Sequence, residues 1–245
     1  MKTLKETVSV IMPAYNEGRQ IFNNIEETVK IFKEFECDYE IVVVDDGSPD
    51  NTYEEIQRAA NTFRNIIAVQ NKKNYGKGRA LKKGFRYTKG EYIVFLDSDM
   101  DLHPIQLQTF IDIMRLDDAD VVIGSKRHPN SKLDYPWHRK FVSAVYFFLI
   151  KLMFGLPIND TQTGLKLFKR EVLEKVFSKL LVKKFAYDLE ILVLAHHIGF
   201  KIAEAPIVMK SQAGIWPMVR PRHIVETLWD TMAIWYRMYV LKYYD

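Results

Sequence analysis

Two aspartates, Asp97 and Asp99, follow directly after Tyr92–Leu96, an apolar run with the composition of a buried strand. At the loop where such a strand ends, the two carboxylates can converge on one cation, and Asp101 adds a third oxygen donor nearby. Carboxylates with few other ligands suit Mg²⁺ or Mn²⁺, which keep water ligands and bind phosphates. We therefore expect an ion here that bridges a diphosphate and stabilises it as it departs. The alternative is a turn whose aspartates cap the helix expected at Pro104.

A second acidic turn, Asp45-Asp46-Gly47-Ser48, ends the apolar run Tyr39–Val44. In an open α/β sheet a carboxylate at this position can accept hydrogen bonds from a base or a ribose. Glycine also permits a positive φ here, and Ser48-Pro49-Asp50 can start a helix. Both interpretations can hold together, with one aspartate serving each role.

The segment Asn74–Arg79 combines glycines, cations and the expected start of a helix. Backbone N–H groups and the positive end of a helix dipole make it a reasonable anion site, with Lys77 as its first cation. The pattern matches neither the P-loop nor the dinucleotide-binding glycine motif. A solvated basic turn is the alternative interpretation of Lys77 and Arg79.

The second half of the chain contains a basic cluster with interleaved aromatic residues: Lys126, Arg127, His128, Lys132, Tyr135, Trp137, Arg139 and Lys140. Nucleic-acid binding and recognition of a lipid phosphate at a membrane would both produce this pattern. The apolar segment Phe141–Phe154 follows at once and favours the membrane. Residues 1–123 carry 16 Lys and Arg against 21 Asp and Glu, a net −5, whereas residues 124–245 carry 19 against 10, a net +9. The alternative is that this difference in charge arose by chance among surface residues that keep the protein soluble.

Five short apolar runs alternate with helical patterns: Val8–Met12, Tyr39–Val44, Ile66–Val69, Tyr92–Leu96 and Val121–Ile123. The helical patterns cover about residues 21–32, 48–63, 77–87 and 105–116. This alternation predicts an α/β fold with an open, mainly parallel sheet and helices on both faces. Ligands bind at the carboxyl ends of the strands in such sheets. Several candidate residues fall there: Tyr15, Glu17, Asp45, Asp46, Asp97, Asp99 and Lys126.

The length of 245 residues, 48% of them hydrophobic, fits one α/β domain with an appendage. We expect a catalytic domain over residues 1–210, divided into a donor half (1–123) and an acceptor half (124–210), and an amphipathic helical segment over 211–245. The single cysteine, Cys37, excludes an intramolecular disulfide. We see no secretory signal and no uncharged apolar run of about 18 residues.

In the second half of the chain we expect a strand near Leu165–Phe168 and an apolar helix over Tyr187–Ile198. Much of the remaining apolar character lies in Phe141–Phe154 and in a helix over His223–Tyr239. An apolar stripe runs along the last helix: Ile224, Leu228, Met232, Trp235 and Tyr239. We expect both segments to lie in the plane of a membrane interface, with three aromatic anchors: Trp229, Trp235 and Tyr236. Burial against the domain or in a dimer contact is the alternative.

Five motifs occur in order at the ends of the expected strands: Pro13-Ala14-Tyr15-Asn16-Glu17, Asp45-Asp46-Gly47-Ser48, Asn74–Arg79, Asp97-Ser98-Asp99 and Gly124-Ser125. Their combination, over residues 8 to about 127, resembles the family-2 inverting glycosyltransferases with the GT-A type fold. The resemblance implies a nucleotide-sugar donor and Mg²⁺ or Mn²⁺ as cofactor. It places Pro13, Tyr15, Glu17 and one of Asp45 and Asp46 around the nucleotide, and Asp97, Asp99 and Asp101 on the metal. We add Lys77, Asp97 and Ser98 to the donor site.

Arg139–Ser143 and Asp160–Arg170 resemble the polyprenyl- or dolichyl-phosphate sugar synthases, and the second motif is closer to the dolichyl-phosphate glucosyltransferases than to the mannose enzymes. The resemblance implies that the lipid phosphate is bound by Lys126 or Arg127, Arg139 and Ser143. Tyr187–Glu190 matches a further acidic motif that lines the sugar or acceptor pocket. The expected catalytic residues are Asp99, Arg139 and Asp188.

Two positions depart from the family pattern. Mannose synthases of this group usually carry Gln where Asp101 stands, so the resemblance leaves direct coordination by Asp101 open. Lys126 stands where relatives carry Arg after the Gly-Ser pair, with Arg127 following. A lysine donates as a point charge where an arginine forks, so either residue can serve the phosphate.

The expected reaction is inverting transfer of a hexose from UDP-glucose or GDP-mannose to dolichyl or polyprenyl phosphate. A phosphate oxygen is already anionic, so its attack needs no strong base and depends on positioning and electrostatics. The expected location is cytoplasmic, peripheral on the membrane face, with no nucleic-acid partner.

Two other functions stay open. A family-2 glycosyltransferase with a glycan or small hydroxyl acceptor would need a general base, for which Asp188 or Glu190 is the candidate. A nucleotidyltransferase or nucleotide-binding regulatory protein would share the sheet but show pyrophosphate chemistry or no turnover with nucleotide sugars. An acceptor screen separates these functions, because only a lipid phosphate gives a product that extracts with lipid.

Overall fold

The computed structural model describes residues 6–35, 37–133, 137–182, 186–209 and 221–245, and the side chains of 133–145 and 221–224 lie outside the description. The first half contains β1 (Val8–Ala14), α1 (Ile21–Glu34), β2 (Tyr39–Asp45), α2 (Thr52–Thr62), β3 (Ile66–Gln70), α3 (Lys77–Phe85), β4 (Tyr92–Phe95), the 3₁₀ turn η1 (Pro104–Gln106), α4 (Leu107–Leu116) and β5 (Val121–Ser125). The second half contains β6 (Lys132–Leu133), α5 (Trp137–Phe154), β7 (Lys166–Lys169), α6 (Arg170–Lys179), α7 (Tyr187–Ile198), β8 (Ile202–Pro206), β9 (Val208–Met209) and α8 (Pro221–Tyr239).

A seven-stranded sheet in the order β3-β2-β1-β4-β7-β5-β8 forms the centre of the molecule. All neighbouring strands run parallel except at β7, which is antiparallel to both β4 and β5. The expected open, mainly parallel sheet is confirmed. The sequence pattern did not predict that β7, from the second half, separates β4 from β5. Residues 1–123 and 124–210 therefore both contribute strands to one sheet.

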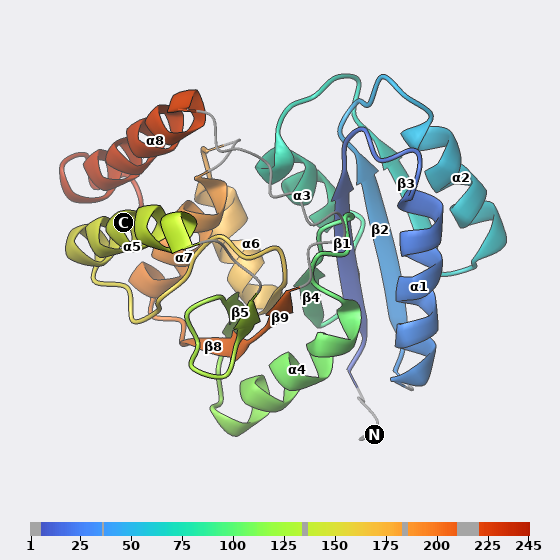
Figure 1. Ribbon diagram of the computed structural model, residues 1–245, viewed down its shortest axis with the longest axis horizontal. Helices are drawn as coiled ribbons and strands as arrows, with labels where there is room; N and C mark the ends of the chain where they lie inside the picture. Colours follow the sequence, from blue (N-terminus) through green and yellow to red (C-terminus); the bar gives the residue numbers. More distant parts are fainter. Residues whose placement is uncertain (1–5, 36, 134–136, 183–185, 210–220) are drawn as a thin grey trace.

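Helices cover both faces of this sheet (Figure 1). One apolar core joins the sheet to α1, α2 and α4, and the other joins it to α3, α6 and α7 and continues outward to α5 and α8. Neighbouring side chains along a strand point to opposite faces, so Ile11 lies in the second core whereas Val10 and Met12 lie in the first. The buried sheet holds the strand ends, and hence the candidate site, in a fixed geometry.

Most expected elements are found, with ends that differ by a few residues. The second helix starts at Thr52 rather than at Ser48, because the Asp50 carboxylate accepts hydrogen bonds from the Thr52 N–H at 3.2 Å and from its hydroxyl at 2.5 Å. The fourth helix is preceded by η1 and starts at Leu107. The fifth strand continues through Gly124 to Ser125, because Gly124 pairs with Ala205 of β8.

The helix Tyr187–Ile198 is found with the expected bounds, and it ends where Gly199 adopts a left-handed φ of 98°. The last helix, α8, packs on α5, where the Tyr146 hydroxyl lies 2.9 Å from that of Thr231. Among the described residues, no helix is both long enough and apolar enough to cross a membrane. The expected boundary at residue 210 falls within 210–220, which lie outside the described residues.

Candidate active site

The site lies at the carboxyl edge of the sheet, where β1, β2 and β4 end together. Parallel pairing aligns Ala14 with Asp45 and Ile11 with Phe95, so the segments that follow these strands emerge at one edge. Figure 1 shows this edge between α3 and the loop that leads to α4. Short apolar strands followed by polar turns thus bring together the motifs that the sequence pattern placed there.

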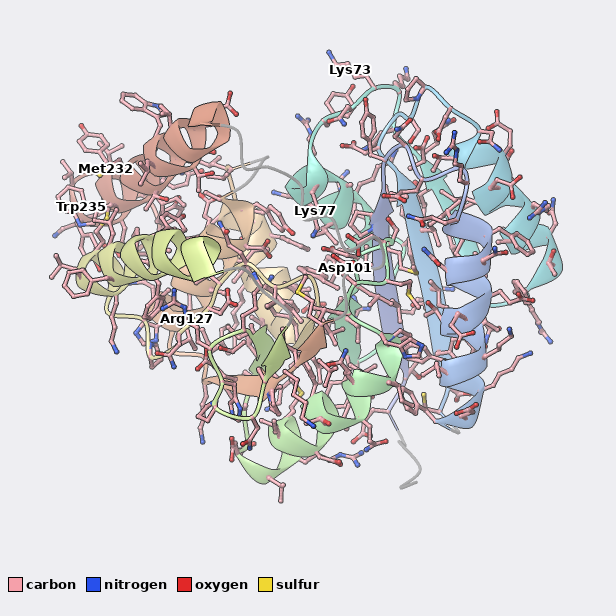
Figure 2. All side chains as sticks on the ribbon, in the orientation of Figure 1. Lys73, Lys77, Asp101, Arg127, Met232 and Trp235 are labelled. Carbon is pink, nitrogen blue, oxygen red and sulfur yellow. The ribbon has the colours of Figure 1, made fainter. Side chains whose placement is uncertain are left out.

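Lys77, the first residue of α3, forms an ion pair with Asp97 at the end of β4. Burial lowers the pKa of Lys77, but the charges of Asp97, Asp188 and Asp99 outweigh it and raise the pKa overall. Figure 2 places Lys77 and Asp101 close to the centre of the molecule, at the sheet edge. Lys77 is therefore a protonated cation facing several carboxylates.

Gly164 lies against the other side of the Asp97 carboxylate. A Cβ at position 164 would overlap Asp97 Oδ2, so only glycine leaves room for this carboxylate. Gly78 of α3 packs in the same way on Tyr187 of α7, where an added Cβ would lie 2.6 Å from the Cβ of Tyr187. One glycine therefore lets the loop before β7 approach the acidic turn, and the other lets α3 approach α7.

Asp99 and Asp101 share this crowded acidic turn. Burial, followed by the charge of Asp97, raises the pKa of Asp99 to about 6, and the same two causes raise the pKa of Asp101. Between them Met100 adopts a left-handed φ of 59°, and the Asp101 N–H donates to Asp99 Oδ1 at 3.1 Å. A cation brought to this turn would relieve the repulsion.

The donor chemistry of this turn fits Mg²⁺ or Mn²⁺, but its geometry is only part of a site. Among the described residues, no three Asp, Glu, His or Cys side chains converge as a ready metal cage. The structure thus does not bring Asp97, Asp99 and Asp101 together as one ligand set. Magnesium-type sites commonly use one or two carboxylates and complete the shell with substrate phosphates and water. Asp97 and Asp99 suit that arrangement.

Asp45 and Asp46 are buried and hold the neighbouring turns. Asp45 accepts from the Ser48 N–H at 3.0 Å and the Gln70 amide at 3.2 Å. Asp46 accepts from the Asn71 amide at 2.7 Å and from the N–H groups of Tyr75 and Gly76 at 3.1 and 2.8 Å. Asp46 therefore shapes the loop that leads into Lys77. A nucleotide contact by either aspartate stays a prediction.

The remaining donor-site candidates surround the ends of β1 and β4. Pro13 lies within β1, and Tyr15, 47% exposed, follows it at the surface. Glu17 accepts from the Gln20 amide at 2.6 Å, and the Ser98 carbonyl accepts from the Asn24 amide at 2.7 Å. A cleft next to them is lined by Asn16, Glu17, Arg19, Gln20, Asp50 and Asn51.

Sequence reasoning missed Lys166, which is buried beside Asp188. Its ammonium lies 2.5 Å from Asp188 Oδ1 and also donates to the carbonyl of Thr163. Buried charges occur in pairs, so a lysine inside the apolar pattern of β7 was the available signal. One carboxylate oxygen of Asp188 is therefore already paired with a cation.

Glu190, two residues after Asp188 in the first turn of α7, has a structural role instead of the expected one. It is fully buried and accepts from the N–H groups of Leu181 and Val182 at 3.1 and 2.6 Å. The Tyr244 hydroxyl and the Arg237 guanidinium also bind it, the latter at 3.2 Å. Glu190 therefore cannot be the general base, because no acceptor can reach its carboxylate.

The basic cluster is only partly described. The Lys126 N–H donates to Asp160 Oδ2 at 3.0 Å and its ammonium lies 3.9 Å from the same oxygen, a partner that sequence reasoning did not assign. The Arg127 guanidinium lies 4.9 Å above the Phe147 ring of α5, near its label in Figure 2. The side chains of Arg139 and Ser143 lie outside the described residues.

Comparisons with known proteins agree with this arrangement. The family model described as "Glycosyl transferase family 2" matches residues 9–177. The chain is 35% identical over 209 residues to dolichyl-phosphate beta-glucosyltransferase ALG5A of Trichomonas vaginalis, covering 82% of this chain and 64% of that protein. It is 32% identical to glycosyltransferase AglD of Haloferax volcanii, covering 82% and 32%. The chain thus spans less than two thirds of the length of these relatives.

Solved structures show the same fold at low identity. Mannosyl-3-phosphoglycerate synthase from Rubrobacter xylanophilus superposes with a TM-score of 0.71 at 15% identity, covering 95% of this chain and 74% of that one. Glucosyl-3-phosphoglycerate synthase from Mycobacterium tuberculosis, in complex with Mn²⁺, UDP and phosphoglyceric acid, superposes with 0.68 at 18% identity, covering 94% and 78%. The expected GT-A type fold is confirmed.

Proposed function

Because the chain belongs to glycosyl transferase family 2, we propose that it transfers a hexose from a nucleotide sugar to dolichyl or polyprenyl phosphate, with inversion at the anomeric carbon. The observation that supports this acceptor best is the 35% identity, over 82% of the chain, to a dolichyl-phosphate beta-glucosyltransferase. The names of such relatives favour glucose as the sugar, and UDP-glucose is therefore the first donor to test, ahead of GDP-mannose.

The acidic turn and Lys77 form the donor side of the proposed site. Asp97 and Asp99 would hold Mg²⁺ or Mn²⁺, which supplies positive charge to the leaving diphosphate. Lys77 lies against Asp97 and can turn its ammonium toward a diphosphate oxygen, since its side chain is 36% exposed. Asp46 keeps Lys77 in place through the loop of Tyr75 and Gly76.

The acceptor side supports a phosphate rather than a hydroxyl group. A hydroxyl acceptor needs a free general base, but Asp188 is paired with Lys166 and Glu190 is fully buried. A phosphate oxygen needs no such base. Lys126, Arg127, Arg139 and Ser143 are the proposed ligands of the lipid phosphate. The positive charges of the lysine and the two arginines lower the cost of bringing two phosphate groups together.

The outer helices supply an apolar surface for a membrane-bound acceptor. Phe148 and Leu152 of α5 and Trp229 of α8 are 70%, 75% and 76% exposed. Much of the apolar stripe of α8 that the sequence pattern indicates faces outward, including Leu228, Met232 and Tyr239, while Ile234 and Met238 face the core. Large exposed apolar patches mark interaction sites. We place the protein on the cytoplasmic face of a membrane, as a peripheral protein.

The test is incubation with a panel of UDP- and GDP-sugars, polyprenyl phosphate and Mn²⁺, followed by analysis of the lipid phase. We expect a lipid-extractable hexosyl phosphate from UDP-glucose, and its anomeric configuration reports inversion or retention. Asp99→Ala should lose at least about 100-fold in rate while its circular dichroism is unchanged. Transfer to a soluble hydroxyl acceptor with no lipid product would refute the phosphate acceptor, and pyrophosphate release without transfer would refute the reaction class.

A further inference from the structure

The segment Lys72–Lys89 carries eight Lys and Arg and no Asp or Glu. It comprises the loop before α3, the helix itself and the turn after it. Lys77 points to Asp97 and belongs to the site described above. The other seven form what we term the α3 cationic face: Lys72, Lys73, Arg79, Lys82, Lys83, Arg86 and Lys89. This concentration of one charge is independent of the donor site.

Several members of the α3 cationic face lie close to one another. Lys73 and Arg79 lie 5.5 and 5.0 Å from the centre of one ring, that of Tyr75. Lys82 and Arg86 are four residues apart at the end of α3, about one helical turn, and burial followed by the charge of Arg86 lowers the pKa of Lys82. Lys73, Arg79 and Arg86 are exposed, whereas the opposite side of α3, with Ala80 and Leu81, is buried on the sheet.

No described carboxylate pairs with these seven cations. Lys83 donates to the carbonyl of Gln70 at 2.6 Å and Lys82 approaches the carbonyl of Leu180 at 3.5 Å, both uncharged groups. By contrast, Lys30 on α1 lies 3.8 and 3.7 Å from Glu26 and Glu27. Unpaired like charges repel, and an anionic partner would relieve that repulsion.

The apolar surface of α8 lies on the same side of the sheet. Leu81 of α3 and Ile234 and Met238 of α8 belong to one core. Both elements border the upper part of the molecule in Figure 1, and Figure 2 shows Lys73 there, with Met232 on the outer side of α8. The exposed cations of α3 and the exposed Trp229 and Met232 of α8 thus lie on elements that cover one side of the sheet, and these two kinds of group match the charged headgroups and the acyl chains of a bilayer surface.

We propose that the α3 cationic face docks on an anionic lipid bilayer, next to the apolar side of α8. This inference rests on the proposed lipid-phosphate acceptor and adds an electrostatic attachment that is separate from the phosphate ligands near Arg139. A nucleic acid is the competing partner, because the segment also carries Tyr75 and the 46% exposed Tyr87, and the RNA measurement below separates it from a bilayer.

The test measures sedimentation of the full chain with phosphatidylcholine vesicles that contain no or about 30 mol% phosphatidylglycerol. The variant Lys73→Glu/Arg86→Glu is compared with Lys33→Glu/Arg64→Glu, which makes the same charge change at exposed positions on α1 and before β3. We expect the first variant to bind anionic vesicles at least about 25-fold more weakly, about fivefold for each cation lost. The matched control should bind as the wild type does.

The salt dependence of vesicle binding and the binding of RNA test the proposal further. About 0.5 M KCl should remove most of the anionic preference, since it screens exposed charges. Equal binding of both variants, or equal binding to neutral and anionic vesicles, overturns the proposal. Binding to single-stranded RNA that is tighter than binding to anionic vesicles, and that only the α3 variant loses, also overturns the proposal. These assays contain no donor or acceptor, and transfer to detergent-solubilised polyprenyl phosphate tests the proposed function separately.

Discussion

The ammonium of Lys166 lies 2.5 Å from a carboxylate oxygen of Asp188, and the two side chains are only 2% and 9% exposed. Lys166 belongs to β7 and Asp188 to the first turn of α7, so the pair joins the sheet to the helix that covers it. A buried charge without its partner is costly, whereas a buried pair is nearly balanced. The pair therefore fixes the position of Asp188 at the edge of the site.

Lys166→Met should lower the free energy of unfolding by about 3–5 kcal/mol, because it removes the cation in direct contact with the buried Asp188 carboxylate. The double variant Lys166→Met/Asp188→Leu should recover most of that loss, since both charges are then absent. Urea unfolding measures both values. A single variant as stable as the wild type would contradict the description of Asp188 as a buried, neutralised carboxylate.

Asp99→Asn should stabilise the metal-free protein at pH 7.5. Burial and Asp97 raise the pKa of Asp99 to about 6, above its value of about 4 in an unfolded chain. The folded state therefore resists ionisation of Asp99. The resulting loss in the free energy of unfolding grows as the pH rises from about 4 to about 6 and is complete above that. We expect a gain of about 1–3 kcal/mol at pH 7.5 that vanishes below about pH 4.

Thermal or urea unfolding in EDTA at several pH values measures this gain. Asp117→Asn, at an exposed position after α4, is the control and should show no such pH-dependent gain. Equal stability of Asp99→Asn and the wild type at every pH would show that Asp99 is not held in a crowded acidic turn.

Gly164→Ala should impair the site without removing any charge. The added Cβ would overlap the Asp97 carboxylate, which must then move away from its present position beside Lys77. We expect the affinity for Mn²⁺ with UDP, and the transfer rate, to fall by about 10- to 100-fold, because displacement by an ångström has effects of that size. Calorimetric titration and the lipid-phase assay measure the two quantities.

Gly155→Ala is the matched control for this experiment. Gly155 has a φ of 64° but no atom within 4 Å of an added Cβ, so alanine costs about 1 kcal/mol of backbone strain without touching the site. Similar losses of Mn²⁺ affinity in both variants would trace the effect to general destabilisation rather than to Asp97.

Arg139→Ala should raise the KM for polyprenyl phosphate by about 10- to 100-fold, the effect of losing one charge-assisted hydrogen bond, and leave UDP binding unchanged. This prediction rests on the position of Arg139 in the basic cluster and on the family resemblance. Lys151→Ala, at an exposed position further along α5, is the control. An equal loss of donor binding in Arg139→Ala would refute its assignment to the acceptor phosphate.

Local sequence patterns determined much of this protein. Apolar runs of five or six residues, ended by Pro13 or by an acidic turn, predicted β1, β2 and β4 and placed Asp45 and Asp97 at one edge of the sheet. An apolar helix followed by a glycine predicted α7 with its correct ends. These features depend on residues a few positions apart, where periodicity and turn chemistry act directly.

The tertiary structure alone decided which groups meet. The antiparallel insertion of β7 between β4 and β5 depends on strand pairing over long separations, which no local pattern encodes. It brings Gly164 against Asp97 and Lys166 against Asp188. Local propensity set the elements and their polar ends, but close packing and the pairing of buried charges decided that Asp188 is neutralised and that Glu190 supports the core.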